Sequence, residues 1–170
     1  IEGCQPLISP HFNLTVELVV WEDVPSAHGR PQEIINRDHL ARCELFVGML
    51  NEAWGSDTGK YPSGFEEEFT IAEESLNATG RPAMGLLFKH VDDRRVKDPG
   101  KDFAKVLAFK DSIGDRILHK TFKSETEFKE QFEDILAAHV LSLKAKRANQ
   151  VAREDQAERG PTSDGAAEGA

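Results

Sequence analysis

Apolar runs that predict strands alternate along this chain with amphipathic segments that predict helices. The strands are expected at residues 14–20, 43–50, 84–88 and 117–122. The helices are expected at about residues 31–42, 63–77, 102–113 and 124–143. Strands and helices in alternation predict an α/β fold, in which a parallel sheet lies between two layers of helices.

The two ends of the chain differ from this pattern. Residues 1–8 are typical of the end of an amphipathic helix. Because a helix in such a sheet normally follows a strand, we expect a first strand and most of a first helix upstream of Ile1. Residues 144–170 contain few large apolar side chains, so they cannot bury enough surface to offset the entropy of ordering. We therefore predict one domain over residues 1–143, followed by a helical extension and a disordered linker or tail over residues 144–170.

Composition excludes several classes of protein. With 170 residues the chain suits one domain, and 21 basic against 30 acidic side chains give a net charge of -9. The tail carries five of each sign, so the negative charge belongs to residues 1–143. Such a surface repels phosphate backbones, and no apolar run approaches the ~20 residues of a membrane span. Neither nucleic acid nor a membrane is therefore an expected partner. Two cysteines without a C-x-x-C spacing fit a reducing, cytoplasmic location.

Ligands of open α/β sheets bind beyond the carboxyl ends of the strands, so the loops there hold the candidate site. The loop after strand 14–20 carries Trp21, Glu22, Asp23 and Arg30. Glu22 and Asp23 can position a ribose hydroxyl or simply end a strand. Arg30 suits a pyrophosphate, because a guanidinium binds it through two hydrogen bonds, but a surface role is equally compatible.

The loop after strand 43–50 is long and rich in glycine, and loops of this length are often functional. Its Trp54 and Tyr61 can stack on a base or can pack within the loop. Its remaining candidate binding residues are small or hydroxylated, namely Gly55, Thr58, Ser63 and Gly64. The spacing from Gly55 to Lys60 does not match a phosphate-binding P-loop, which needs four residues between its glycines and a Ser or Thr after the lysine. The six histidines show no spacing typical of metal ligands, so no metal is expected.

Three adjacent glutamates follow this loop, and helical geometry separates their roles. Ser63 and Glu66 form a capping box at the start of the helix. Glu68 lies on the same face as the apolar stripe formed by Phe65, Phe69, Ala72 and Leu76, whereas Glu67 is expected to face water. Glu68 is therefore the candidate catalytic carboxylate, of a kind that stabilises or attacks a developing sugar cation. Alternatively, all three glutamates merely complement the helix dipole.

The order of these motifs resembles the DUF4062 domain over residues 1 to about 143. The resemblance rests on Trp21-Glu22-Asp23, the stretch from Arg30 to Asn36, Cys43 to Gly48, Trp54-Gly55 with Thr58-Gly59, and Ser63 to Phe69. That domain is similar to the TIR and nucleoside 2-deoxyribosyltransferase-like group. The resemblance implies a flavodoxin-like sheet with strand order 2-1-3-4-5. It also implies a glutamate four residues after a glycine, which is Glu68 after Gly64.

Members of that wider group cleave N-glycosidic bonds in NAD or in nucleosides, while other TIR-like domains act only as scaffolds. The resemblance thus implies a nucleotide-processing domain with NAD or a related nucleotide as substrate and no resident cofactor. The alternative is a non-catalytic domain for self-association or other protein–protein interaction. DUF4062 domains commonly precede an NTPase or repeat module in larger signalling or defence-type proteins. Such a module and a homo-oligomer are the expected partners.

Overall fold

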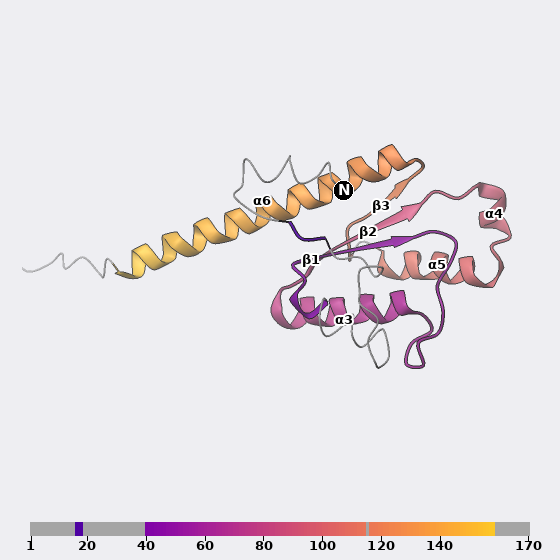
Figure 1. Cartoon of the computed structure of the whole chain (residues 1–170), viewed down its shortest axis with the longest axis horizontal. Helices are drawn as coiled ribbons and strands as arrows, with labels where there is room; N and C mark the ends of the chain where they lie inside the picture. The colour runs from indigo at the N-terminus through magenta and orange to yellow at the C-terminus, as the bar shows by residue number, and fades with distance from the viewer. Residues whose placement is uncertain (1–15, 19–39, 115, 159–170) are drawn as a thin grey trace, which may run out of the picture.

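The sheet of this protein is parallel and is covered by helices on both faces. The computed structural model describes residues 16–18, 40–114 and 116–158 (Figure 1). Its strands lie side by side in the order β1 (Leu45–Leu50), β2 (Ala83–Lys89) and β3 (His119–Phe122). Both neighbouring pairs run parallel, with Val47 opposite Gly85 and Leu87 opposite Lys120. The predicted α/β class with a parallel sheet is confirmed.

The helices divide between the two faces of the sheet. Figure 1 shows α3 (Gly64–Thr79) and α5 (Gly100–Ile113) on one face and α6 (Glu125–Glu158) on the other. Of the predicted helix at 31–42, only its end is described, as the 3-10 turn η2 (Leu40–Arg42). Of the predicted strand at 14–20, Val16–Leu18 adopts no regular structure and the other residues lie outside the described part.

Alternating side chains of the strands build two cores. Phe46, Leu86 and Phe88 face α3 and α5, where they pack with the buried Phe69 and Phe103. The intervening positions face α6, where Leu87 packs with Phe122 and Ile135. A period of two along each strand therefore fixes which helix each residue meets.

Side-chain caps set the starts of the main helices. The Ser63 hydroxyl accepts a hydrogen bond from the Glu66 amide at 3.0 Å, as the capping box predicted. At the start of α6, Ser124 accepts from the Glu127 amide at 3.2 Å. The Glu127 carboxylate in turn accepts from the Lys123 amide at 2.7 Å. These bonds satisfy amides that have no partner within the helix.

One helix was not predicted from the sequence. It is α4 (Asp93–Lys97), in the charged stretch after β2. The Asp92 carboxylate caps this short helix by accepting from the Arg94 amide at 2.8 Å. At the other end of the domain, α6 continues past Leu143 to Glu158 without interruption, over the first part of the segment where a helical extension was predicted. No glycine or proline stands between these residues, so no residue there stops a helix already nucleated against the sheet.

Gly48 gives a test of how tightly β1 packs against α3. A Cβ there would lie 2.6 Å from the Leu86 Cδ2 and 2.8 Å from the Phe65 Cε2. We expect Gly48→Ala to lower the free energy of unfolding by about 1–3 kcal/mol in urea denaturation, because the core must shift to admit a methyl group. Met49, the next residue of β1, is 60% exposed. Met49→Ala should cost less than about 1 kcal/mol, and an equal loss in both variants would contradict the packing described.

Candidate functional site

A structured loop, residues 51–63, leads from the carboxyl end of β1 to α3. Gly55 and Gly59 have φ of 96° and 82°, a backbone conformation that favours glycine. Residues 58–61 form a turn, in which the Thr58 amide donates to the Tyr61 carbonyl at 3.0 Å. The Tyr61 amide donates to the Thr58 hydroxyl oxygen at 3.2 Å. The loop is therefore held in one shape by its own hydrogen bonds.

Glu67, in the first turn of α3, is the buried carboxylate of this region. Its exposed fraction is only 2%. One carboxylate oxygen accepts a hydrogen bond from the Thr58 hydroxyl at 2.6 Å, a length typical of a charge-assisted bond. The prediction that Glu67 faces water is thus wrong.

The reason for this error is the loop itself. Glu67 does lie about 200° around the helix from Phe65, on the side opposite the apolar stripe. Helical periodicity distinguishes two sides of a helix, but it does not tell whether solvent or another segment covers the second side. Here residues 51–63 fold back over it, and Thr58 supplies the hydroxyl that a buried carboxylate requires. A hydroxyl and several glycines shortly before an acidic helix start are the signal that could have indicated this.

Glu68, the predicted catalytic residue, is half-buried and follows Glu67 directly as the fifth residue of α3, just past its first turn. Its position at a helix N-terminus favours the ionised carboxylate. The loop that Glu67 holds in place starts at the carboxyl end of β1, so Glu68 stands at the sheet edge where ligands of this fold bind. Its catalytic role stays a prediction.

Only some of the other predicted site residues lie near Glu68 in the described part of the chain. Thr58, Tyr61, Ser63 and Gly64 lie together between the loop turn and the first turn of α3. The residues predicted after strand 14–20 lie outside the described part of the chain, namely Trp21, Glu22, Asp23 and Arg30.

Trp54 belongs to the core of the protein. It is 5% exposed, and its ring packs at 5.8 Å from the Phe65 ring and 5.3 Å from the Phe109 ring, measured between centroids. Gly55 directly after it is exposed. Little of the indole is therefore left for a ligand to stack upon, and of the two aromatic residues predicted as ligand contacts in this loop, Tyr61 alone is partly exposed.

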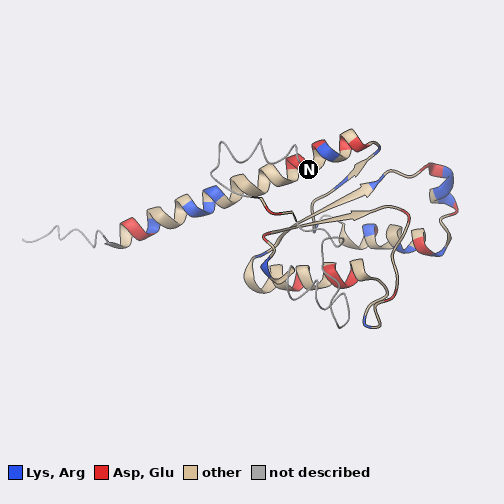
Figure 2. Cartoon of the chain, viewed as in Figure 1, with Lys and Arg blue, Asp and Glu red and all other residues tan. Residues whose placement is uncertain are grey.

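An ion pair that the sequence did not indicate joins this loop to α4. The Arg95 Nε donates to the Glu52 carboxylate at 2.6 Å, and the Arg95 Nη1 donates to the Asp98 carbonyl at 3.2 Å. The blue stretch beyond the carboxyl end of β2 in Figure 2 marks the basic residues of α4. Because 43 residues separate Glu52 from Arg95, only the tertiary structure brings the two together.

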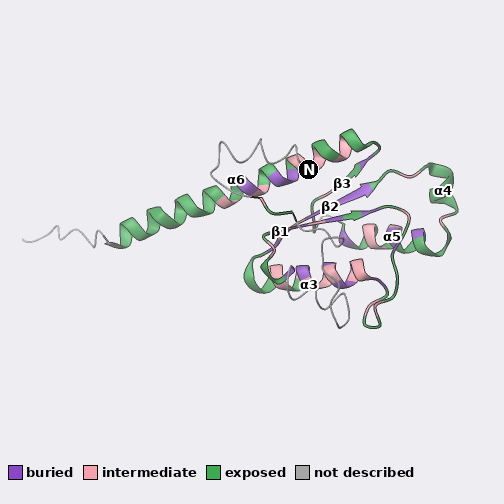
Figure 3. Ribbon diagram, in the orientation of Figure 1, coloured by how far each residue is buried: buried purple, intermediate pink, exposed green. Residues whose placement is uncertain are grey.

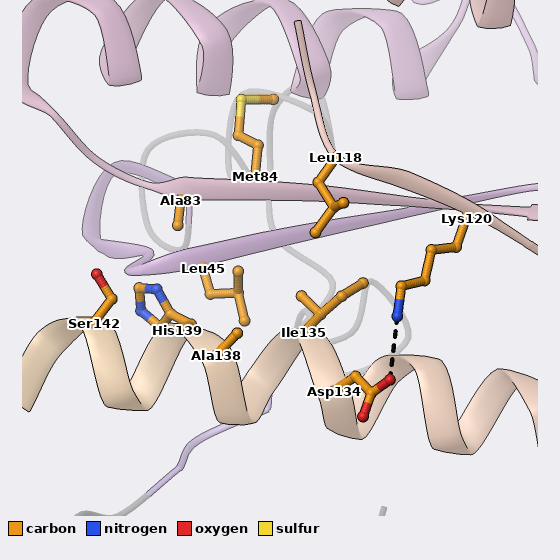
Figure 4. A pocket seen from close by; sticks show the side chains of 10 residues that line it. All are labelled: Leu45, Ala83, Met84, Leu118, Lys120, Asp134, Ile135, Ala138, His139 and Ser142. Carbon is orange, nitrogen blue, oxygen red and sulfur yellow. Dashed lines mark hydrogen bonds and ion pairs between the residues drawn. The ribbon is translucent and has the colours of Figure 1, made fainter. Parts of the chain in front are cut away.

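A shallow groove of about 380 Å³ lies at the opposite end of the sheet, between α6 and the first residues of β1 and β2 (Figure 4). Its walls are mostly apolar, with an ion pair of 3.1 Å between Lys120 and Asp134 at one end. His139 and Ser142 lie at the other end. The His139 Nε2 is buried and has no hydrogen-bond partner among the described residues. Burial lowers the pKa of His139, which nearby Glu44 raises and Lys146 lowers further.

Cysteine and metal chemistry are not indicated by the described residues. The half-buried Cys43 thiol donates to the Leu45 carbonyl at 2.9 Å. Burial, the largest effect, raises the pKa of this thiol, so the reactive thiolate is disfavoured. The part of the chain that the structure describes contains no group of three or more acidic, histidine or cysteine side chains arranged to bind a metal.

Comparison with known protein families assigns the chain to one of them. The family model described as a domain of unknown function (DUF4062) matches residues 5–137. The chain belongs to the DUF4062 family. The match covers β1 to β3 and the first third of α6, so the loop of residues 51–63 and both glutamates are part of the DUF4062 domain. Neither a curated protein nor a solved structure matches the chain significantly. No described helix of this DUF4062 protein has the length and apolar character to cross a membrane.

The Thr58–Glu67 hydrogen bond can be tested by removing the hydroxyl. We expect Thr58→Val to lower the free energy of unfolding by about 1–3 kcal/mol, because a buried carboxylate loses a donor. Thr121→Val is the matched control, since Thr121 is exposed and its hydroxyl accepts a hydrogen bond from Lys110 at 3.1 Å. The control should change stability by less than about 0.5 kcal/mol in the same urea titration. Equal losses of stability in the two variants would show that the hydrogen bond between Thr58 and Glu67 does not stabilise the fold.

His139 makes the stability of the protein depend on pH. A histidine whose folded pKa lies below its ordinary value of 6.5 binds a proton more readily when unfolded. Its contribution to stability is therefore lost as the pH falls through the ordinary value, from about 7 to about 5. We expect His139→Gln to lose less stability than the wild type over this range in urea denaturation at each pH. A constant difference between wild type and variant would contradict the pKa direction.

Proposed function

We propose that this DUF4062 domain processes nucleotides by cleaving the N-glycosidic bond of NAD or a related nucleotide, with Glu68 as the key carboxylate. The observation that carries the proposal is the placement of Glu68, half-buried near the start of α3 and directly after Glu67, which holds the loop through Thr58. A larger signalling or defence-type protein is the proposed setting for this reaction.

The chemistry follows from where charge develops in such a reaction. Breaking an N-glycosidic bond leaves positive charge at the anomeric carbon of the sugar, so an ionised carboxylate stabilises the transition state or attacks that carbon. A helix N-terminus favours the ionised form of a nearby carboxylate, which is the form that this chemistry requires. Glu67 cannot take this part as readily, because its carboxylate is buried and already accepts the Thr58 hydroxyl. Glu67 would then serve as a positioning residue that fixes the loop next to Glu68.

The test follows release of nicotinamide from NAD, and of free base from nucleosides, by the full-length protein. Glu68→Gln should lower the rate at least about a hundredfold, because it removes a charge that stabilises the transition state. Glu74→Gln, at an exposed glutamate of the same helix, is the matched control and should leave the rate unchanged. Turnover that survives Glu68→Gln would contradict the role of Glu68. No turnover of any of these substrates by the wild type would contradict the catalytic proposal as a whole.

A non-catalytic interaction domain is the second candidate, and one observation favours it. Trp54, a residue expected to contact a ligand, is 5% exposed and packs among Phe65 and Phe109. The Thr58 hydroxyl is likewise used for a bond inside the protein. In this loop the Trp54 ring and the Thr58 hydroxyl contact other parts of the protein. Such a loop is compatible with a scaffold as well as with an enzyme. Absence of turnover in the assay above, with a stably folded protein, would favour this candidate.

A further inference from the structure

The second half of α6 extends away from the rest of the protein. Beyond Leu143 the helix leaves the sheet, and residues 144–157 are all exposed (Figures 1 and 3). Val151 in the middle of this extension is 56% exposed. An exposed helix of this length needs either strong intrinsic propensity or a partner that covers one side.

Charges on the extension are sorted by face. An α-helix turns about 100° per residue, so the positions within about 60° of Val151 can be counted from the sequence. Within residues 144–157 we call this side the Val151 face, and it comprises Lys144, Arg147, Ala148, Val151, Glu154 and Asp155. The basic residues of the face come first and the acidic residues last, with two apolar side chains between them. The opposite side of the same segment contains no acidic residue and comprises Ala145, Lys146, Asn149, Arg153, Gln156 and Ala157.

Two copies of this face are complementary in charge when the helices run antiparallel. If two copies lie antiparallel, Arg147 of each comes opposite Asp155 of the other, and the two Val151 side chains meet near the centre. A parallel pair would instead bring Arg147 against Arg147 and Asp155 against Asp155. Opposite charges across a helix pair select its partner and its orientation.

We propose that the Val151 face binds the same face of a second copy of this chain in an antiparallel helix pair. The face continues the side of α6 that packs on the sheet, where Leu136 and Val140 are buried. An antiparallel pair has two-fold symmetry, which is the commonest symmetry of protein dimers. The apolar area between the helices is small, so we expect a weak dimer that dissociates on dilution. This interaction surface is separate from the site at the carboxyl end of the sheet.

The test is sedimentation equilibrium of the 170-residue chain, comparing two substitutions of the same kind. Arg147→Glu places a like charge opposite Asp155 and should weaken the dimer about tenfold, since two ion pairs become repulsive. Arg153→Glu makes the same charge change on the opposite side of the helix and should alter the dissociation constant less than about twofold. Circular dichroism confirms that both variants keep the helix.

A reversal of both charges tests the orientation. Asp155→Arg alone should weaken the dimer about as much as Arg147→Glu. The double variant Arg147→Glu/Asp155→Arg should self-associate again, but it should not pair with the wild type. A double variant that pairs preferentially with the wild type would show a parallel arrangement and overturn the proposal. A wild type that stays monomeric at about 1 mM, or equal weakening by Arg147→Glu and Arg153→Glu, would overturn it as well.

Discussion

The buried carboxylate of Glu67 joins two segments of the chain at the carboxyl end of the sheet. A carboxyl group that is 2% exposed must be hydrogen-bonded, and the Thr58 hydroxyl meets part of that need at 2.6 Å. The bond ties the loop of residues 51–63 to the first turn of α3. Because Glu68 is the next residue of α3, the surroundings of Glu68 depend on this bond. The proposed role of Glu68 therefore depends on Glu67, which does not itself take part in the reaction.

The two ends of the sheet offer different chemistry. The carboxyl end carries the Glu67–Thr58 bond and the ion pair between Glu52 and Arg95, so its loops are fixed by charged groups. The other end is a shallow apolar groove with His139 at its margin. Carboxylates suit a reaction at a sugar carbon, whereas the one carboxylate that lines this groove, Asp134, is already paired with Lys120. This contrast is why the catalytic proposal is placed at the carboxyl end.

Sequence patterns predicted those elements of the fold that depend on residues close together along the chain. The strand at 45–50 and the cap at Ser63 follow from apolar runs and capping preferences, and both were predicted. The prediction failed where the outcome depended on a distant segment, as for Glu67 beneath the loop. The short helix α4 was missed because one Asp92 cap turns a charged stretch into a helical turn.

The sequence by itself determined the α/β class, the family and the faces that the helices bury, because these follow from periodicity and from motifs close together along the chain. Only the tertiary structure decided which glutamate is buried, that Trp54 lies in the core, and that Arg95 reaches Glu52. Burial and pairing of charged groups depend on what covers them, and the covering segment can be many residues away. A local pattern shows which side of a helix is polar, but tertiary packing decides whether that side meets water.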